Sequence, residues 1–313
     1  MLTLPVDQQK DARPSYRPFA ASVLRVVELS PTFRRVTFTG ADLRGFGTDG
    51  LDQRIKLVLP VNGGFGALNW ADEQMIADGT WYQAWRALPV EARAPFRTYT
   101  VRAVRAALGE VDVDFVVHGD AGPAARWILA AREGDEVIIV GPDALSIDSH
   151  VGIDWRPGDA TTVLLAGDET AAPAICSILE SLPAGMRATA FIEVPHAADA
   201  QPIDSAADIT VRWIARDRDE LQLGDAVRAW LAEHPTAYAP ALATAAQVVE
   251  EIDVDVDMLW DSPEEARGEF YAWLAGESAM IKSLRRLLVT ETGIDRRRVA
   301  FMGYWRLGKP EVQ

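Results

Sequence analysis

The hydrophobic pattern of the chain changes near residue 142, and this change limits the folds available to it. Up to that point, short runs with strand-like alternation are separated by turn residues, and one helical run interrupts them. The expected strands are 19–28, 33–39, 52–60, 96–102, 110–118 and 136–140, and the expected helices are 124–132 and a short one at 72–78. Short strands with frequent turns predict a small antiparallel barrel of six strands.

The second half of the chain alternates between strands and helices. The expected strands are 161–166, 187–194, 209–214, 269–275 and 299–305, and the expected helices are 170–182, 225–233, 241–251 and 278–291. Such alternation is typical of a parallel sheet covered by helices. The predicted fold class is therefore a β-barrel followed by an α/β domain.

The predicted domain boundaries follow from this change of pattern. Residues 1–15 are polar and contain two prolines, so we expect a loose tail. Residues 16–142 form the barrel domain, and the irregular segment 143–158 is the linker. Residues 159–313 form the α/β domain and its C-terminal segment.

The four residues Arg97-Thr98-Tyr99-Thr100 bring a cation, an aromatic ring and hydroxyls into one predicted strand. In a regular strand, Arg97 and Tyr99 face one side, and Thr98 and Thr100 face the other. A bend is therefore needed if Tyr99 and Thr100 are to touch the same ligand.

A strand, a turn and a helix follow this motif. Strand 110–118 ends at His118, and the turn contains Gly119 and Gly122 before Pro123, which suits the first position of a helix. A helix start made of small residues offers N–H groups and the positive end of the helix dipole to a phosphate. Each half alone is best explained as an ordinary strand or a well-capped helix. Together they favour a phosphorylated aromatic cofactor.

Composition narrows the classes of function. The single cysteine, Cys176, excludes an intramolecular disulfide and a cysteine-ligated iron–sulfur cluster. We find no apolar run long enough to span a bilayer and no signal-peptide core, so we expect a cytoplasmic protein without membrane insertion. The formal net charge of −15 argues against nucleic acid as a partner. An anionic substrate would need a local basic pocket.

The four histidines are scattered and have no paired spacing, which argues against a protein metal site. They are His118, His150, His196 and His234.

Two motifs carry a resemblance to known flavoproteins. Arg97-Thr98-Tyr99-Thr100 resembles the Arg-x-Tyr-Thr/Ser flavin motif of the ferredoxin-reductase-like superfamily. Its continuation, His118-Gly119-x-x-Gly122-Pro123-Ala124-x-x-Trp127, resembles the siderophore-interacting protein family. Members of that family are FAD-dependent ferric-siderophore reductases, and the resemblance extends from about Tyr16 to Gly308.

The resemblance implies roles for the motif residues. Arg97 would contact the phosphate or ribityl part of FAD, with Thr98 beside it. Tyr99 would pack on the isoalloxazine and Thr100 would bond near its reactive nitrogen, which makes these two the catalytic candidates. The diphosphate would be held by His118, Gly119, Gly122, Pro123, Ala124 and Ala125, with Trp127 supporting the helix. Two departures from the family pattern are Ala125, where many relatives have serine, and Asp143-Ala144, where relatives often have a basic residue and a glycine.

The turn Gly167-Asp168-Glu169-Thr170 joins the first strand and helix of the second domain. Its single glycine is equally compatible with a plain turn and with a dinucleotide site. The resemblance implies that NADH or NADPH binds there. Glu193 suits a ribose hydroxyl and NADH, whereas Arg212, Arg216 and Arg218 suit a 2′-phosphate, so the sequence leaves the donor open.

Three basic residues are candidates for holding a ferric siderophore. The family binds this substrate in a cleft with Lys and Arg residues, and the candidates here are Lys56, Arg126 and Arg306. Each is also compatible with a solvated surface charge, and Arg126 with the FAD phosphates. Arg306 lies in the segment Tyr304-Trp305-Arg306, which resembles the C-terminal motif of the family. A separate candidate is Glu277, which either lies near the nicotinamide or caps a helix.

The expected function is transfer of electrons from NAD(P)H through FAD to Fe(III) in a siderophore, with release of Fe(II). Two alternatives are a flavin or ferredoxin-type reductase with another acceptor, and a carrier of flavin or siderophore without turnover.

Overall fold

The protein comprises two compact units, each with its own core. The structure is a computed structural model that describes residues 9–47, 50–61, 63–117, 122–245, 247, 259–263 and 267–308. The first unit contains Phe33–Ile153 and the residues before Ser30, and the second contains Ser30–Thr32 and the residues from Asp154 onward. The division falls inside the segment 143–158 that the sequence suggests as a linker.

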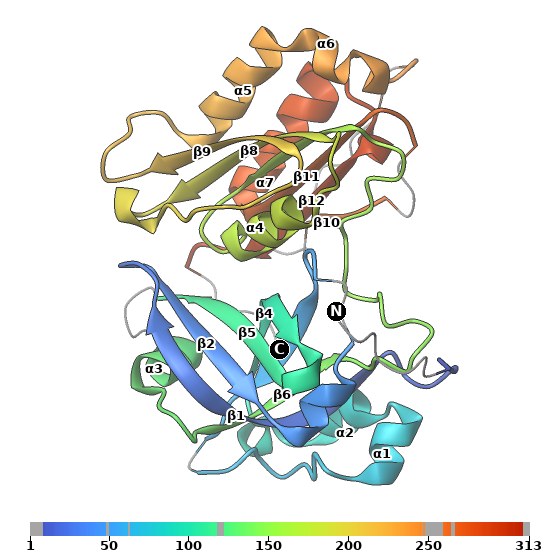
Figure 1. The fold of residues 1–313 in the computed structure, drawn as a ribbon, viewed down its shortest axis with the longest axis vertical. Coiled ribbons are helices and arrows are strands. Elements are labelled where there is room, and N and C mark those ends of the chain that lie inside the picture. The colour runs from blue at the N-terminus through green and yellow to red at the C-terminus, as the bar shows by residue number, and fades with distance from the viewer. Residues whose placement is uncertain are drawn as a thin grey trace. The chain divides into compact units, whose positions relative to one another are not determined.

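The first unit is a closed antiparallel barrel (Figure 1), and its six strands have the order β1-β2-β5-β4-β3-β6. The strands are β1 (Tyr16–Glu28), β2 (Phe33–Thr39), β3 (Arg54–Val58), β4 (Phe96–Arg105), β5 (Glu110–Val116) and β6 (Glu136–Pro142). Helix α3 (Pro123–Ala130) connects β5 to β6. The predicted barrel is confirmed, because alternate residues of these strands fill its interior.

The long connection between β3 and β4 covers the outside of the barrel. It forms α1 (Glu73–Asp78) and α2 (Trp81–Ala87), of which only the first was expected. Trp85 is fully buried, packs on Phe96 with ring centroids 4.5 Å apart, and donates a hydrogen bond to the Ala94 carbonyl at 3.0 Å. Val58 and Val140 join this second, outer cluster. The connection therefore buries apolar side chains that would otherwise face water.

The second unit contains a six-stranded sheet in the order β10-β12-β11-β7-β8-β9. The strands are β7 (Thr162–Gly167), β8 (Arg187–Val194), β9 (Asp208–Ala215), β10 (Trp260–Asp261), β11 (Phe270–Glu277) and β12 (Val299–Trp305). All neighbours are parallel except β10, which pairs antiparallel with β12. The predicted parallel sheet is thus confirmed, with one short antiparallel edge strand added to it.

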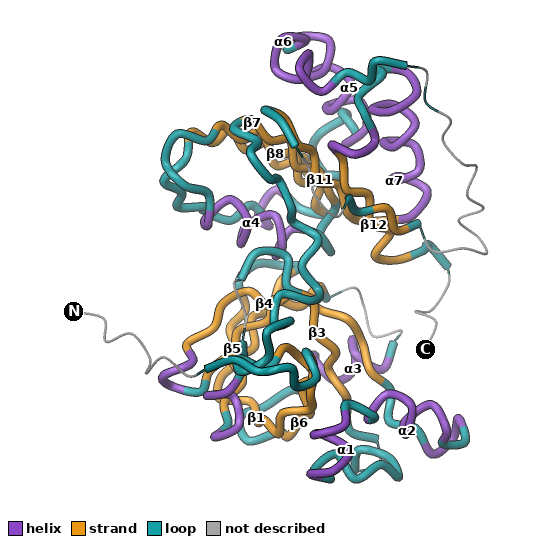
Figure 2. Tube along the Cα trace, turned by 90° about the vertical axis from the view of Figure 1, so that its right-hand side faces the viewer, coloured by secondary structure: helices purple, strands orange, loops and turns teal. Residues whose placement is uncertain are grey.

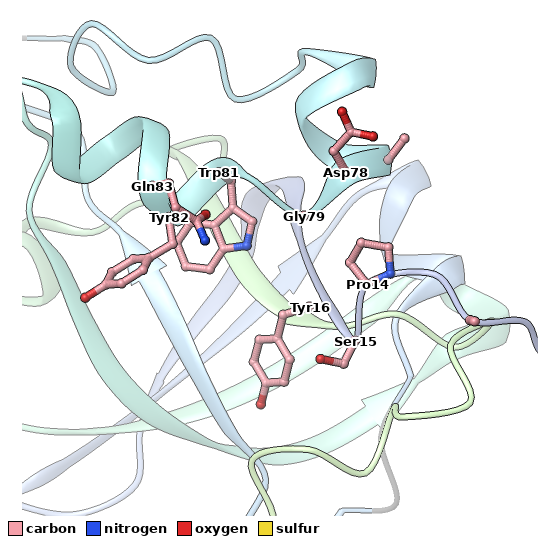
Figure 3. A pocket seen from close by; sticks show the side chains of 10 residues that line it. Pro14, Ser15, Tyr16, Asp78, Gly79, Trp81, Tyr82 and Gln83 are labelled. Atoms are coloured by element: carbon pink, nitrogen blue, oxygen red, sulfur yellow. The ribbon is translucent and has the colours of Figure 1, made fainter.

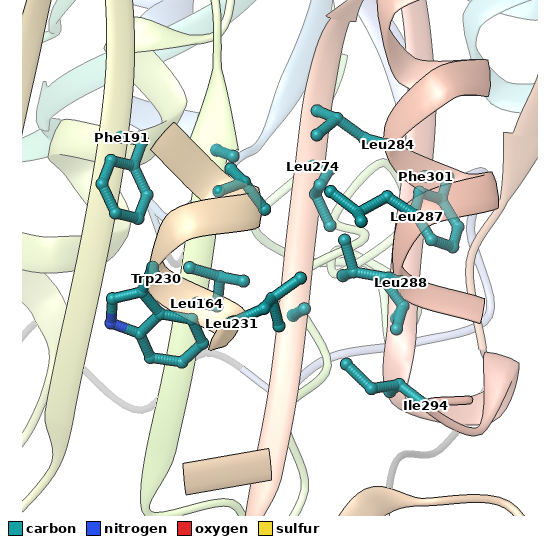
Figure 4. Packing of buried hydrophobic residues seen from close by; sticks show 14 of the residues in the cluster. Leu164, Phe191, Trp230, Leu231, Leu274, Leu284, Leu287, Leu288, Ile294 and Phe301 are labelled. Atoms are coloured by element: carbon teal, nitrogen blue, oxygen red, sulfur yellow. The ribbon is translucent and has the colours of Figure 1, made fainter. Parts of the chain in front are cut away.

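Helices cover both faces of this sheet, as Figure 2 shows within the second unit. The helices are α4 (Ala172–Ser181), α5 (Leu223–Glu233), α6 (Pro235–Tyr238) and α7 (Ser278–Arg285), and α7 continues as a π-helix over Arg286–Glu291. On the face of α5 and α7, Trp230 and Leu231 pack with Leu284 and Leu288 over the strands (Figure 4). Burial on both faces explains why β7 and β11 read as continuous apolar runs.

The helix predicted at 241–251 is wrong for the part that the structure describes. A 3₁₀ turn ends at Ala241, and residues 242–245 are not helical. Ala243 instead donates its N–H to the Gly293 carbonyl at 2.9 Å, and the Asp295 N–H donates to the Ala241 carbonyl at 2.8 Å. Hydrogen bonds to a distant segment have replaced those of a helix. Among the described residues, no helix is both long and apolar enough to cross a membrane.

Candidate functional site

The motif Arg97–Thr100 lies on β4, directly beside β3. Thr98 faces Lys56 across the antiparallel pair, and Tyr99 faces Ile55. Directly opposed residues in such a pair share one side of the sheet. The pairing is regular through Thr100, so Arg97 and Tyr99 lie on one side and Thr98 and Thr100 on the other. The pairing of β4 with β5 shifts only between Val101 and Ala103, beyond the motif.

A chain of aromatic contacts connects Tyr99 to helix α3. The Tyr99 ring lies 4.5 Å from that of Phe115 on β5, and Phe115 lies 5.9 Å from Trp127 on α3. Trp127 also stacks on Phe38 at 6.2 Å with a 19° angle between the ring planes. The two halves of the sequence motif are therefore joined through the barrel core. The sequence suggested a supporting role for Trp127 but gave no sign of Phe115 as the intermediate contact.

Two half-buried side chains of β3 and β4, Lys56 and Arg97, carry positive charge. Lys56 Nζ donates a hydrogen bond to Thr98 Oγ1 at 2.6 Å and lies 5.3 Å from the centre of the Phe96 ring. Arg97 Nη1 donates to the Phe96 carbonyl at 2.8 Å. The pair β3–β4 thus presents the Lys56 ammonium beside Phe96 on one side and the Arg97 guanidinium on the side of Tyr99.

Helix α3 begins with small residues and has no side-chain cap. Gly122 precedes it in an extended conformation and, as a glycine, offers no side-chain cap, and Pro123 is its first residue. The first N–H groups of a helix lack partners inside the helix. A Cβ atom added at Gly122 would meet no atom within 4 Å. Arg126 is exposed on this helix.

These residues fit FAD in two respects. The helix start can accept a diphosphate, and the aromatic chain from Trp127 holds Tyr99 in place for a flat ring. Two of the proposed diphosphate contacts, His118 and Gly119, lie outside the described residues, whereas Ala124 and Ala125 are half-buried in the first turn.

In the second unit, the turn after β7 is packed tightly against its own neighbours. A Cβ at Gly167 would come 2.5 Å from the Ala275 carbonyl oxygen on β11 and 2.5 Å from the Ala171 Cβ. Any side chain there would force strand and helix apart. Close packing is therefore sufficient reason for a glycine at this position.

Asp168 is buried and joins the ends of three strands. Its Oδ1 accepts from the Thr170 N–H at 2.9 Å, and its Oδ2 accepts from the Glu277 N–H at 2.7 Å and from Trp305 Nε1 at 2.8 Å. Burial raises the pKa of this carboxyl, and the hydrogen bonds from Thr170 and Trp305 oppose that rise. The Asp168 carboxylate is thus occupied by hydrogen-bond donors of the protein itself. Thr170 is half-buried and is therefore more accessible to a ligand than the buried Asp168.

Glu169 is also buried, and it binds an arginine that follows β9. Arg216 Nη2 donates to Glu169 Oε1 at 2.7 Å and Arg216 Nη1 donates to Oε2 at 2.9 Å. Arg216 Nη1 also donates to Glu193 Oε1 on β8 at 3.2 Å. The sequence singled out these three residues separately but not as one cluster. One feature of the sequence could have indicated the cluster. Each of the three residues stands at or just after the end of a predicted parallel strand, and the carboxyl ends of such strands share one edge of the sheet.

Two further candidates lie near the ends of β11 and β12. Glu277 is the cap of α7, because its Oε2 accepts from the N–H groups of Ala279 at 2.7 Å and Met280 at 2.9 Å. Arg306 directly follows β12 and is half-exposed.

One cavity is at the outer cover of the barrel, where the connection between β3 and β4 meets the segment before β1 (Figure 3). It has a volume of about 750 Å³, and Tyr16, Trp81 and Tyr82 are among the side chains that line it. None of the site residues predicted from the sequence borders it.

The class of the protein follows from this arrangement. A six-stranded antiparallel barrel with an arginine, a tyrosine and a threonine on β4, followed by a mostly parallel sheet, is the ferredoxin-reductase-like architecture. The ferredoxin reductase in carbazole 1,9a-dioxygenase superposes with a TM-score of 0.56 over 93% of this chain and 70% of its own, at 14% identity. At that identity the likeness shows the fold alone.

More specific comparisons define the family. The family model described as siderophore-interacting FAD-binding domain matches residues 22–146, and the model for siderophore-interacting protein matches residues 160–308. The chain is similar to the ferric vibriobactin reductase ViuB of Vibrio cholerae, with 30% identity over 294 residues that cover 94% of this chain and 91% of the relative. A siderophore utilization protein from T. fusca superposes with a TM-score of 0.65 and 26% identity over 96% of this chain and 97% of its own. The chain belongs to the siderophore-interacting protein family, and its cofactor is FAD.

Proposed function

We propose that this protein is a ferric-siderophore reductase, which takes electrons from a nicotinamide nucleotide and delivers them to Fe(III) held by a siderophore. The observation that carries the proposal is the aromatic chain that joins the Arg97–Thr100 strand to the uncapped start of α3, in a member of this family. Fe(II) binds a hard oxygen chelator less strongly than Fe(III), so reduction releases the metal. Because the proposed donor is a nicotinamide nucleotide, the proposal places the reaction in the cytoplasm.

FAD supplies the chemistry that connects a two-electron donor to a one-electron acceptor. The chain's own residues bind and orient it. Arg97 neutralises negative charge on the cofactor, and Tyr99, held by Phe115, provides a flat apolar surface for the ring. Thr100 is buried and lies on the opposite side of the strand from Tyr99, and the regular pairing places no bend between them, so this proposal assigns the ring contact to Tyr99 and not to Thr100.

The first N–H groups of α3 hold the diphosphate in this proposal. Gly122, Ala124 and Ala125 leave room for it, because none places a bulky side chain at the helix start. Arg126 is exposed on the same helix and adds positive charge for a phosphate or for the substrate.

Lys56 is the proposed contact for an anionic siderophore on the barrel unit. Its ammonium group is oriented by Thr98 and is only half-buried. In a chain of net charge −15, such a local cation provides the attraction that the whole protein does not. Arg306 is the corresponding candidate on the second unit.

The test is anaerobic visible spectroscopy of the purified flavoprotein. NADH or NADPH is added first, and a ferric siderophore is added afterwards. We expect the flavin absorbance to bleach with a nicotinamide nucleotide and to return with the ferric chelate. Absorbance that stays oxidised with both nucleotides would contradict the proposed donor and would favour a carrier. Absorbance that bleaches but does not return with any ferric chelate would favour a different acceptor.

A further inference from the structure

The carboxyl ends of β7, β8 and β9 bring one arginine against two carboxylates. Glu169 follows β7, Glu193 is the next-to-last residue of β8, and Arg216 directly follows β9. The three strands are adjacent and parallel, so their ends lie along one edge of the sheet. This edge is where α/β sheets of this kind bind nucleotides.

Arg216 pairs with two carboxylates through its two terminal nitrogens. It forms a bidentate pair with Glu169, whose side chain is 2% exposed, and a second ion pair with Glu193, whose side chain is 19% exposed. Two fixed negative charges therefore face one positive charge. A guanidinium compensated in this way offers little net attraction to a further anion.

The charged residues on and after β9 do not add a net positive charge to this edge of the sheet. Arg218 pairs with Asp219 at 3.3 Å, and Asp217 Oδ2 lies 3.0 Å from His196 Nδ1. Arg212 is exposed on β9 and acts electrostatically on Asp219. Together with the cluster above, the described ionised groups named here comprise three arginines and four carboxylates.

Glu193 also has the position and the acceptor capacity for a ribose hydroxyl. Its Oε2 accepts from the Leu223 N–H at the start of α5 at 3.0 Å, and its Oε1 accepts from Arg216. These contacts fix the carboxylate, and two carboxylate oxygens offer about four acceptor positions. An acidic residue at the end of the second strand is the usual partner of an unphosphorylated ribose.

From this geometry we infer that Glu169 and Glu193 neutralise Arg216 and make this edge select NADH over NADPH. A 2′-phosphate carries a charge of about −1.5 to −2 near neutral pH. It would meet a guanidinium that two carboxylates already hold, and it would be repelled by Glu193. The inference rests on the proposed nicotinamide donor and names which form of it is used.

The experiment measures binding to the FAD-loaded protein by isothermal titration calorimetry, using ADP-ribose and 2′-phospho-ADP-ribose. Neither compound can reduce flavin, so the readout is independent of turnover. We expect ADP-ribose to bind at least tenfold more tightly. In the double variant Glu169→Gln/Glu193→Gln, the preference should shift by at least tenfold toward the 2′-phosphate, because Arg216 is then released from both charges. Adding Arg216→Ala to the double variant should cancel that gain.

Two further variants serve as controls for misfolding and for a general effect of removing a carboxylate. Because Glu169 is buried, the double variant could fail to fold. The single variant Glu193→Gln changes a partly exposed position and should also shift the preference toward 2′-phospho-ADP-ribose. Glu233→Gln removes an exposed carboxylate about 15 Å further along α5 and should leave the preference unchanged.

The outcomes separate the two proposals. Tighter binding of 2′-phospho-ADP-ribose by the unaltered protein would overturn the inference and leave the reductase proposal intact. An unchanged preference in both Gln variants would overturn the role of this cluster. Failure of both compounds to bind would contradict the nicotinamide donor itself, and with it the inference.

Discussion

Lys56 Nζ and Thr98 Oγ1 form a 2.6 Å hydrogen bond across the β3–β4 pair, on the side of the strands opposite Tyr99. The bond fixes the ammonium group of Lys56, on β3, against the neighbouring strand that carries the flavin motif. Lys56→Met should therefore weaken binding of an anionic ferric chelate by roughly fivefold, which corresponds to about 1 kcal/mol for a partly exposed charge. Binding of a neutral ferric chelate should not change.

The matched control for this prediction is Thr98→Val, which removes the hydrogen bond and keeps the charge. It should retain the preference for the anionic chelate. The measurement is a titration of each chelate monitored by quenching of protein fluorescence. Equal losses for both chelates in Lys56→Met would show that Lys56 acts through packing rather than charge.

Arg97→Ala should release FAD. A charge-assisted hydrogen bond contributes about 1.5 to 3 kcal/mol, so the dissociation constant of FAD should rise by roughly 10- to 100-fold. The measurement is flavin content after gel filtration, followed by titration of the apoprotein with FAD. Arg25→Ala is the control, since Arg25 is about half exposed on β1 and lies 3.6 Å from Glu110. Full flavin retention in Arg97→Ala would remove Arg97 from the proposed cofactor contacts.

Asp168→Asn should loosen the strand ends that meet at this carboxylate. All of its described partners donate hydrogen bonds, so an amide group would direct its own N–H at one of them. The expected cost is about 2 kcal/mol. Hydrogen–deuterium exchange should speed up at the Glu277 amide and at the end of β12.

The control for this change is Asp208→Asn, an exposed carboxylate on β9. It should leave exchange at both places unaffected. Unchanged protection in Asp168→Asn would mean that the strand ends are held by packing alone.

Asp112 makes the barrel sensitive to acid. Burial alone would raise its pKa, but hydrogen bonds from Arg105 and Thr37 more than offset burial and hold the pKa below its ordinary value of 3.8. A carboxyl with a lowered pKa in the folded state contributes stability above pH 3.8, and that contribution is lost as the pH falls through the folded-state value. At neutral pH, Asp112→Asn should cost about 2 kcal/mol.

Hydrogen–deuterium exchange of the β5 amides measures this effect on the barrel alone. The difference between the unaltered protein and Asp112→Asn should be largest at neutral pH and should shrink below pH 3.8. Glu133→Gln, an exposed position, should show no such pH dependence. A difference that stays constant with pH would exclude Asp112 as the titrating group.

Much of the fold follows directly from local sequence. The strands predicted at Phe33–Thr39, Arg187–Val194 and Val299–Trp305 have their observed bounds, and the last two have an alternating or apolar pattern along their whole length. The segment after Ala241 was not, because its backbone bonds are made with residues 293–295. A local pattern carries no information about such distant partners.

The candidate site shows the same limit. The motif Arg97–Thr100 and the start of α3 could be recognised from residue types and spacing. The pair Glu169–Arg216 could not, because it depends on the order of β7, β8 and β9 in the sheet. The contact of Tyr99 with Phe115 likewise depends on the register of β4 against β5.

The order of the second sheet also leaves its two edges unequal. One edge ends in β10, which has two residues, whereas the other ends in the eight-residue strand β9. A long edge strand is a template onto which another polypeptide can add. Asp208 and Arg212 are exposed along β9 and would have to lose water if a second strand paired there. Charges of this kind on an edge strand oppose such pairing.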